Sequence, residues 1–297
     1  MPSTAHSVTV IGLGPMGQAM AAAYLDRGYR VTLWNRTPSR ADALVERGAT
    51  LAETPEQAIS ANELVILSLI DYDAMYGVID QAKDAVAGRV FVNLSSDTPE
   101  KARAGARWVT EHGGTHLTGG VLSPPPLIGT PDASTFYSGP REAYDTHRAA
   151  LEVITGKSDY RGEDPGLAAL MYQLNMVIFW PAMIAYWQTV AVAAAHGITA
   201  AEIAPYAAEN FAGMSHFIDF YAPRIDAGNH AGDVDRTSMG LASMEHVVHT
   251  AADAGVDTAF PEAVRDIFRR VVDAGHGADS FSRAVEVMRK GASATAV

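Results

Sequence analysis

A glycine-rich turn close to the start of the chain has the spacing of a dinucleotide-binding site. The apolar run Ser7–Ile11 leads directly into Gly12, Gly14 and Gly17, and a helical pattern follows. In such a turn the first glycine permits a tight bend, the second lets a pyrophosphate approach the backbone, and the third lets the helix pack closely on the strand. The helix N-terminus offers N–H groups and a partial positive charge to the pyrophosphate. The residues expected to contact the cofactor here are Gly12, Leu13, Gly14, Pro15, Met16 and Gly17.

The residues after the second apolar run, Val31–Trp34, indicate which dinucleotide is bound. A site for NAD has Asp or Glu at this point, where it binds the ribose 2′-hydroxyl. This chain has Asn35, Arg36 and Thr37 instead, with Arg40 one helical turn further on. A carboxylate would repel a 2′-phosphate, whereas an arginine binds it through two hydrogen bonds. We therefore expect NADPH, held in part by these four residues; the alternative is an α/β protein whose glycine-rich turn binds no nucleotide.

The elements that position these residues follow from the alternation of strand and helix patterns in the first half of the chain. This alternation predicts right-handed crossovers and a doubly wound, mostly parallel sheet, as in a Rossmann domain. Strands are expected near Val8–Ile11, Arg30–Trp34, Leu64–Leu69, Val90–Asn93, Thr115–Leu117 and Thr135–Tyr137. Helices are expected near Met16–Arg27, Arg40–Arg47, Pro55–Ser60, Asp71–Ala87, Thr98–His112 and Arg141–Ile154. Ser95 and Ser96 follow a strand, and we expect them to contact cofactor or substrate; the alternative is that they cap the next helix.

The character of the sequence changes at the turn-rich segment Arg161–Gly166, after which nearly every pattern is helical. We expect an NADPH-binding domain over residues 1–163 and, over residues 164–297, a long interdomain helix followed by an all-helical dimerisation domain. Helix starts are expected near Thr199, Met214, Ser238, Pro261 and Ser280. A long uncharged helix is hard to bury in one chain of this size, so we expect an intertwined homodimer. Residues 1–6 and 291–297 are expected to be loose ends.

Composition narrows the function classes. The 297 residues carry a net charge of −12, whereas nucleic-acid binding needs clustered Lys and Arg, so no nucleic-acid partner is expected. There are no cysteines, which excludes disulfides and thiolate zinc sites and fits a cytoplasmic location. The uncharged segment Gly166–Ala195 is long enough to span a bilayer, but a helix that is apolar all round also suits the interior of a large soluble protein, the interpretation that we favour. His246 and His249 lie three residues apart without further ligands at suitable spacing, so no metal is expected.

Together these features resemble the β-hydroxyacid dehydrogenase superfamily and, within it, the imine reductases, over essentially the whole chain. The glycine turn, taken with Trp34–Thr37, is similar to the NADPH-binding signature of the imine reductases. Asn93–Pro99 lies where the superfamily has a loop on the substrate and cofactor side. The residues that match the spacing of the imine-reductase active-site signature are Gly162, Asp164, Gly166, Ala168, Leu174 and Met176.

Tyr172, six residues after Gly166, separates the two branches of the superfamily. β-Hydroxyacid dehydrogenases have a lysine at this position, which handles the proton of the substrate hydroxyl, whereas imine reductases replace it, typically with Asp or Tyr. The resemblance therefore implies an imine reductase of the tyrosine type, with a leaning towards (S)-amine products. The loop Gly119–Pro126 is also similar to imine reductases and unlike the carboxylate-binding loop of the dehydrogenases.

The chemistry of the residues points in the same direction. Reduction of a C=N bond needs a hydride donor over the carbon and a proton or hydrogen bond at the nitrogen. Many imines are already protonated near neutral pH, so a neutral tyrosine hydroxyl suffices to orient or protonate the nitrogen. An anionic hydroxy acid would need a Lys or Arg clamp, and the segment Gly162–Ala195 has no basic residue. We expect Tyr172 to be catalytic; the alternative is a buried tyrosine bonded to neighbouring backbone.

Five further residues are expected to contact the imine or iminium substrate: Asn175, Phe179, Trp180, Met239 and His246. Asn175 lies one turn beyond Tyr172 and either holds substrate or the nicotinamide amide, or fills a backbone gap near Pro181. For Phe179, Trp180 and Met239 the alternative is that they belong to the hydrophobic core and do not contact substrate. His246 would approach the cofactor of the partner subunit in an intertwined dimer.

The sequence thus predicts an NADPH-dependent imine reductase that transfers a hydride to cyclic imines or iminium ions. Three alternatives remain: an NADP-dependent β-hydroxyacid dehydrogenase, a catalytically silent NADPH-binding regulator, and a membrane protein anchored by Gly166–Ala195.

Overall fold

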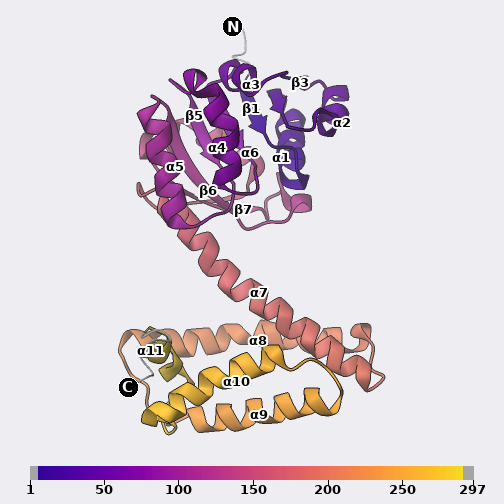
Figure 1. The fold of residues 1–297 in the computed structure, drawn as a ribbon, viewed down its shortest axis with the longest axis vertical. Coiled ribbons are helices and arrows are strands. Elements are labelled where there is room, and N and C mark those ends of the chain that lie inside the picture. Colours follow the sequence, from indigo (N-terminus) through magenta and orange to yellow (C-terminus); the bar gives the residue numbers. More distant parts are fainter. Residues whose placement is uncertain (1–5, 290–297) are drawn as a thin grey trace. The chain divides into compact units, whose positions relative to one another are not determined.

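The computed structural model describes residues 6–289, which divide into two compact units, the first ending at Val177 and the second beginning at Ile178 (Figure 1). The strands, all in the first unit, are β1 (Ser7–Ile11), β2 (Arg30–Trp34), β3 (Thr50–Leu51), β4 (Leu64–Leu67), β5 (Val90–Asn93), β6 (Thr115–Val121), β7 (Ser134–Ser138) and β8 (Lys157–Tyr160). The α-helices are α1 (Pro15–Asp26), α2 (Asp42–Glu46), α3 (Pro55–Ala61), α4 (Tyr72–Ile79), α5 (Pro99–Glu111), α6 (Arg141–Ile154), α7 (Gly166–Ala195), α8 (Ala200–Asp226), α9 (Thr237–Asp253), α10 (Ala259–Val271) and α11 (Ala284–Arg289). The terminal segments expected to be loose ends lie outside the described residues, except for His6.

The first unit is built on one sheet with the strand order β3-β2-β1-β4-β5-β6-β7-β8. Every neighbouring pair is parallel except β6 and β7, which run antiparallel. The order reverses direction between β1 and β4, and doubly wound sheets bind their ligands outside the carboxyl ends of the strands at such a point. The predicted Rossmann-type sheet is confirmed.

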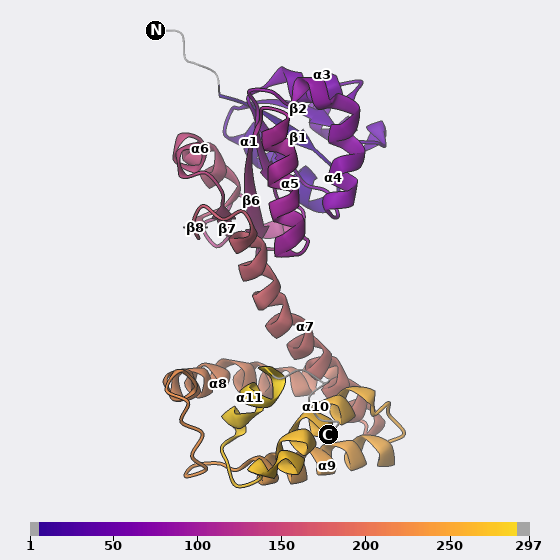
Figure 2. The ribbon, with the colours of Figure 1, turned by 60° about the vertical axis from the view of Figure 1, so that its left-hand side comes forward.

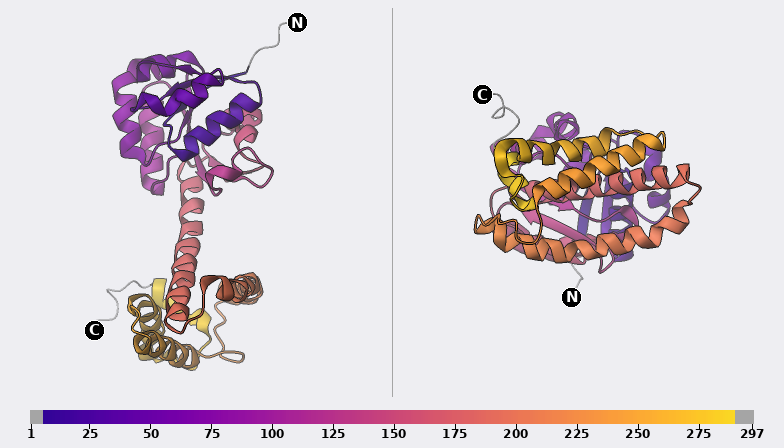
Figure 3. Two further views of the ribbon diagram at one scale, coloured as in Figure 1. Left: turned by 90° about the vertical axis from the view of Figure 1, so that its right-hand side faces the viewer. Right: turned by 90° about the horizontal axis from the view of Figure 1, so that it is seen from below.

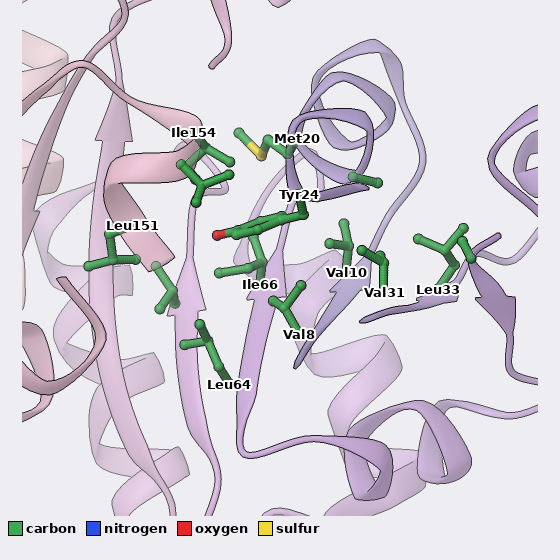
Figure 4. Close-up of a cluster of buried hydrophobic side chains, with 14 of the residues drawn as sticks. Val8, Val10, Met20, Tyr24, Val31, Leu33, Leu64, Ile66, Leu151 and Ile154 are labelled. Carbon is green, nitrogen blue, oxygen red and sulfur yellow. The ribbon is translucent and has the colours of Figure 1, made fainter. Parts of the chain in front are cut away.

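Two buried clusters attach helices to the two faces of this sheet. One cluster joins β1, β2 and β4 to α1, α2 and α6, and Tyr24 and Met20 of α1 lie at its centre together with Leu151 and Ile154 of α6 (Figure 4). The other cluster joins the sheet to α3, α4 and α5, which follow one another along the opposite face (Figure 2). A parallel sheet covered on both faces explains why its central strands are apolar throughout, since β4 and β5 are buried at every position.

The long helix and the helical second half are also confirmed, with one correction. α7 is a single helix of 30 residues, and α8 begins after Thr199, whose side chain forms a capping box with Glu202. The expected helix start near Met214 is wrong, because α8 continues for 27 residues without a break there. In the second unit, α9 and α10 pack as a helical hairpin (Figure 3).

The division between the two compact units falls within α7, after Val177; the domain boundary expected near residue 163 stays a prediction. The first turns of α7 pack on the sheet, where Ala168 and Ala169 are buried, so this part of the helix belongs to the first unit. α7 is long and apolar enough to cross a membrane by length and composition. It is not buried within a single chain, since Phe179 and Trp187 are 47% and 51% exposed. The apolar surface of this part of the helix is therefore left uncovered by residues 6–289.

Candidate active site

A cleft of about 1080 Å³ lies in the first unit at the carboxyl ends of β1, β2, β4, β5 and β6. Of the residues expected to hold cofactor or to act in catalysis, those that line it are Gly12, Leu13, Gly14, Pro15, Met16, Asn35, Arg36, Arg40, Ser95, Ser96 and Tyr172. The structure therefore places the glycine turn, the arginines after β2 and the tyrosine of α7 around one space. Its volume is slightly above the usual range of small-molecule sites, as an extended dinucleotide together with a substrate requires.

The three glycines of the turn are needed for different reasons. Gly12 has φ +93°, and a Cβ atom there would lie 2.3 Å from the Ser68 carbonyl oxygen. A Cβ atom on Gly17 would lie 1.8 Å from the Gly12 carbonyl oxygen, so Gly17 sits beneath the turn and not in the cleft. Gly14 precedes α1, offers no side-chain cap to its first N–H groups, and would place a Cβ atom in open space. An anion can therefore reach the N-terminus of α1 directly.

Asn35 ties the glycine turn to the end of β2. Its Oδ1 accepts a hydrogen bond from the Leu13 N–H (2.9 Å), and its Nδ2 donates to the Thr37 carbonyl (2.8 Å). Both ends of the amide are thus used inside the protein, so Asn35 positions the turn. Thr37 contributes its carbonyl to this loop and does not line the cleft.

Arg36 and Arg40 are exposed, and both line the cleft. Within residues 6–289 neither forms an ion pair. Among the described lining residues they are also the only Lys or Arg side chains. The positive charge of the cleft is therefore concentrated beyond β2, where it suits a phosphate on the adenosine ribose.

The loop after β5 forms the opposite wall and is held by hydrogen bonds from the segment after β4 and from α7, among others. Ser95 is buried, and its Oγ accepts a hydrogen bond from the Leu69 N–H (3.2 Å), which leaves the hydroxyl proton free to donate into the cleft. Gln173 of α7 donates from Nε2 to Ser96 Oγ (3.3 Å) and to the Asp97 carbonyl (3.1 Å). The alternative in which the serines cap the next helix is wrong, because Thr98 caps α5.

The start of α7 is anchored by a paired carboxylate. Arg103 of α5 donates from Nε and Nη2 to the two carboxylate oxygens of Asp164, at 2.8 and 2.7 Å. Asp164 also accepts from the Gly166 N–H (2.9 Å), and the guanidinium together with this backbone donor holds the pKa of Asp164 below its usual value. A Cβ atom on Gly166 would lie 2.8 Å from the guanidinium carbon, so a side chain there would displace Arg103 from Asp164.

A fourth glycine sets the distance between α7 and the sheet. A Cβ atom on Gly120 of β6 would lie 2.8 Å from Tyr172 Cβ and 2.9 Å from the Ala168 carbonyl oxygen. Because Gly120 has no side chain, α7 lies directly against β6, with the half-buried Tyr172 on the wall of the cleft. Tyr172 is thus positioned by the sheet itself, which is the most rigid part of the unit.

Two buried aromatic side chains, His116 and Tyr72, lie near the N-terminus of α4. His116 of β6 is buried and 6.2 Å, between ring centroids, from Tyr72, the first residue of α4. Burial lowers the pKa of His116 to about 4, and burial likewise raises the pKa of Tyr72. Both groups are therefore uncharged at neutral pH.

The remaining predicted residues do not line this cleft. Asn175 donates its amide N–H to the Met171 carbonyl (2.8 Å), one turn earlier in α7, and does not fill a gap at Pro181. The other four belong to the second unit, and their contact with substrate stays a prediction: Phe179, Trp180, Met239 and His246.

Sequence reasoning missed much of the wall. The cleft-lining residues that it did not assign include Ser68, Leu69, Ile70, Asp73, Gly77 and Gln81. The first three directly follow β4, so the rule that ligands bind beyond the carboxyl ends of parallel strands would have found them. Gln173 and Arg103 carried no comparable signal, because their partners lie 76 to 77 and 61 residues away in the chain.

Comparisons with known proteins agree with this arrangement. A family model described as the NAD binding domain of 6-phosphogluconate dehydrogenase matches residues 7–162, and one described as NADPH-dependent reductive aminase-like, C-terminal domain, matches residues 164–290. The NADPH-dependent reductive aminase of Aspergillus oryzae is 30% identical over 288 residues, 96% of this chain and 97% of that protein.

Two solved structures are similar over nearly the whole chain. An imine reductase from Streptomyces aurantiacus is 81% identical with a TM-score of 0.93, covering 95% of this chain and 99% of that chain. A reductive aminase from Aspergillus terreus, in complex with NADPH and ethyl levulinate, is 30% identical with a TM-score of 0.92, covering 96% and 100%.

Proposed function

Because the chain belongs to the family of imine reductases and NADPH-dependent reductive aminases, we propose that it reduces cyclic imines or iminium ions to amines with NADPH. The observation that carries this proposal is the placement of Tyr172 on the wall of the cleft that also holds the glycine turn and Arg36. A proton donor or hydrogen-bonding group and a dinucleotide cradle in one space are what reduction of a C=N bond requires.

The cleft fits NADPH by its own geometry. Gly14 leaves open space at an uncapped helix N-terminus for the pyrophosphate, and Arg36 and Arg40 are free of ion pairs within the described residues, so that they can hold the 2′-phosphate. When bound, NADPH supplies a hydride to the imine carbon. Ser95 and Ser96, on the loop held by Gln173, would contact the cofactor or the substrate from the opposite wall.

Tyr172 would act on the imine nitrogen. Its hydroxyl can donate a hydrogen bond or a proton to the nitrogen, and a protonated iminium ion needs only orientation and charge stabilisation from it. The basic residues among the described lining residues are both needed by the 2′-phosphate, which leaves no cation for a substrate carboxylate. This distribution of charge favours an imine over a hydroxy acid.

A tyrosine variant tests this role. We expect Tyr172→Phe to lower kcat at least about tenfold while NADPH still binds, since an interaction made in the transition state is lost. Tyr76→Phe is the matched control, because Tyr76 is half-buried in the same unit and does not line the cleft. An unchanged kcat in Tyr172→Phe would reduce Tyr172 to a lining residue.

The proposal includes an intertwined homodimer. No residue of α8 is buried within one chain, and Tyr206, Phe217 and Ile218 are exposed along it, as are Trp180 and Trp187 on α7. Contiguous apolar surface of this kind marks an interface. A second copy of the same chain would cover it, and Phe179, Trp180, Met239 and His246 would then line the substrate side of the cleft.

Lipid is the competing cover, because α7 is long enough to cross a bilayer. Two observations favour protein: the first turns of α7 pack on the sheet, and Gln188 in its second half donates to the Asp257 carbonyl (2.8 Å). Sedimentation velocity without detergent should give twice the chain mass, and a stable monomer or a membrane-bound protein would contradict the dimer. The domain boundary near residue 163, the cytoplasmic location and the leaning towards (S)-amines stay predictions; chiral chromatography of the amine tests the last.

A further inference from the structure

The charges on the wall of the cleft are unevenly distributed. Its two arginines, Arg36 and Arg40, both follow β2. The acidic side chains among the described lining residues are Asp73, in the first turn of α4, and Asp97, on the loop after β5. Lys101 of α5 offsets the charge of Asp73, because its Nζ lies 2.7 Å from the Asp73 carboxylate. Asp97 forms no ion pair within the part of the chain that the structure describes.

The Asp97 carboxylate is held in place by backbone groups. Its Oδ1 accepts a hydrogen bond from the Thr98 N–H (2.7 Å), and its Oδ2 accepts one from the Tyr72 N–H (3.4 Å), in the first turn of α4. N–H donors orient a carboxylate without cancelling its charge. Asp97 is half-buried, and a partly desolvated charge that no cation balances is unfavourable. A positively charged ligand in the cleft would supply the missing balance.

The backbone of Asp97 connects it to the catalytic tyrosine. Gln173 donates to the Asp97 carbonyl (3.1 Å), and Gln173 directly follows Tyr172 in α7. Tyr172 and Asp97 both line the cleft. In the sheet, β5 is separated from β2 by β1 and β4, so Asp97 lies at the end of the cleft opposite to the two arginines. The tyrosine end of the cleft therefore carries a fixed negative charge, and the described residues that line this end include no cation.

We propose that Asp97 sets the charge preference for the substrate, attracting an iminium ion and repelling a C=N compound that carries a carboxylate. The inference rests on the proposed function, because it takes a C=N compound as the substrate. Hydride transfer to an iminium ion removes its positive charge, so the attraction is stronger before the transfer than after it. Asp97 is thus a specificity-determining residue that acts on substrate binding, seen in KM, more than on kcat.

Asp97→Asn tests this inference with two cyclic C=N compounds of opposite charge. The 1,2-dimethyl-1-pyrrolinium ion has a fixed positive charge, and 3-(1-pyrrolin-2-yl)propanoate has a carboxylate, with its methyl ester as the neutral reference. The KM for the fixed cation should rise about fivefold or more, with a smaller change in kcat, since a Coulombic attraction in a partly desolvated cleft is lost. The KM for the carboxylate, relative to that for the ester, should fall about threefold or more, since a repulsion is lost.

Two further variants separate the effect of charge from damage to the loop. Asp97→Glu keeps the charge and should keep the preference for the cation. Asp84→Asn is the matched control, because Asp84 is an exposed residue of the 3₁₀ turn η2 (Asp80–Ala85) in the same unit and does not line the cleft. It should leave both KM values unchanged. In Asp97→Asn the Kd of NADPH, which is itself an anion, should not increase.

The opposite charges of the two probes make the outcomes distinct. Opposite changes in the two KM values in Asp97→Asn, with neither change in Asp84→Asn, support the inference. Equal increases for both probes would overturn it, because the lost contacts to Thr98 and Tyr72 would then account for them. Unchanged KM values would also overturn it. Failure of the unmodified protein to reduce any of these C=N compounds would refute the proposed function, and the inference with it.

Discussion

Replacement of Gly120 by alanine tests how the sheet positions Tyr172. The added Cβ atom would lie 2.8 Å from Tyr172 Cβ and 2.9 Å from the Ala168 carbonyl, whereas ordinary contacts begin at 3.4 Å. One of these neighbours is backbone of α7 and cannot rotate away, and β6 is held between β5 and β7. α7 must therefore move by about 0.6 Å or tilt, which displaces the Tyr172 hydroxyl.

The size of the effect follows from the sensitivity of catalysis to position. A misplacement of about 1 Å can lower a rate by about 10²-fold, so a shift of this size should lower kcat by roughly ten- to a hundredfold. The glycine turn and Arg36 are not touched by the new methyl group, so the Kd of NADPH should stay within about twofold.

The assay is steady-state kinetics with a cyclic imine at saturating NADPH, together with the Kd of NADPH and the melting temperature. Ser60→Ala, at an exposed position of the first unit outside the cleft, is the control. A Gly120→Ala enzyme with unchanged kcat would refute the argument that the approach of α7 to β6 positions Tyr172. A matching loss of NADPH affinity would place the damage in the cofactor site instead.

Three further predictions concern charge. Arg36→Ala should raise the apparent KM for NADPH about tenfold or more and that for NADH far less, since a charged hydrogen bond is worth about 1.5–3 kcal/mol; equal effects on both cofactors would contradict the role of Arg36 at the 2′-phosphate. Asp164→Asn should lower the melting temperature at pH 7 more than the control Asp145→Asn, which breaks the exposed ion pair with Arg141. Because the pKa of Asp164 is lowered in the folded protein, its carboxylate stabilises the fold above pH 4, and this stabilisation is lost as the pH falls through that pKa. The difference between the two variants should therefore vanish in acid. The pKa of His116 is about 4 in the folded chain and about 6.5 in the unfolded chain, so the free energy of unfolding should fall by about 2 kcal/mol between pH 7.5 and 5. In urea titrations, His116→Leu should remove this dependence on pH. An equal dependence in the variant would show that other groups cause it.

The parts of the fold that the sequence predicted are those with a strong local signal. β1, α1 and β2 combine apolar runs with a glycine spacing that has one structural meaning, and they were placed within a few residues. The two strands that were missed, β3 and β8, form the two edges of the sheet. β3 has only two residues, and β8 contains Lys157 and Asp159, charged side chains of the kind that protect sheet edges. Apolar periodicity therefore could not reveal them.

The candidate site divides in a similar way. The cofactor turn and the arginines after β2 could be predicted because each depends on neighbours in sequence. The residues that hold Tyr172 in place could not, since Arg103 meets Asp164 and Gly120 meets Tyr172 only once the sheet and α7 have packed. Gly77 and Gln81 of the cleft wall gave no signal, because neither belongs to a motif or directly follows a strand.

The central claim, that this cleft reduces C=N bonds with NADPH, is tested most directly by the loss of NADPH absorbance with 2-methyl-1-pyrroline, run beside NADP⁺ with 3-hydroxyisobutyrate. We predict turnover of the imine, its loss of at least about tenfold in Tyr172→Phe, and no turnover of the hydroxy acid. Turnover of the hydroxy acid alone would contradict the account, because a cation that the cleft does not show would then have to hold the carboxylate.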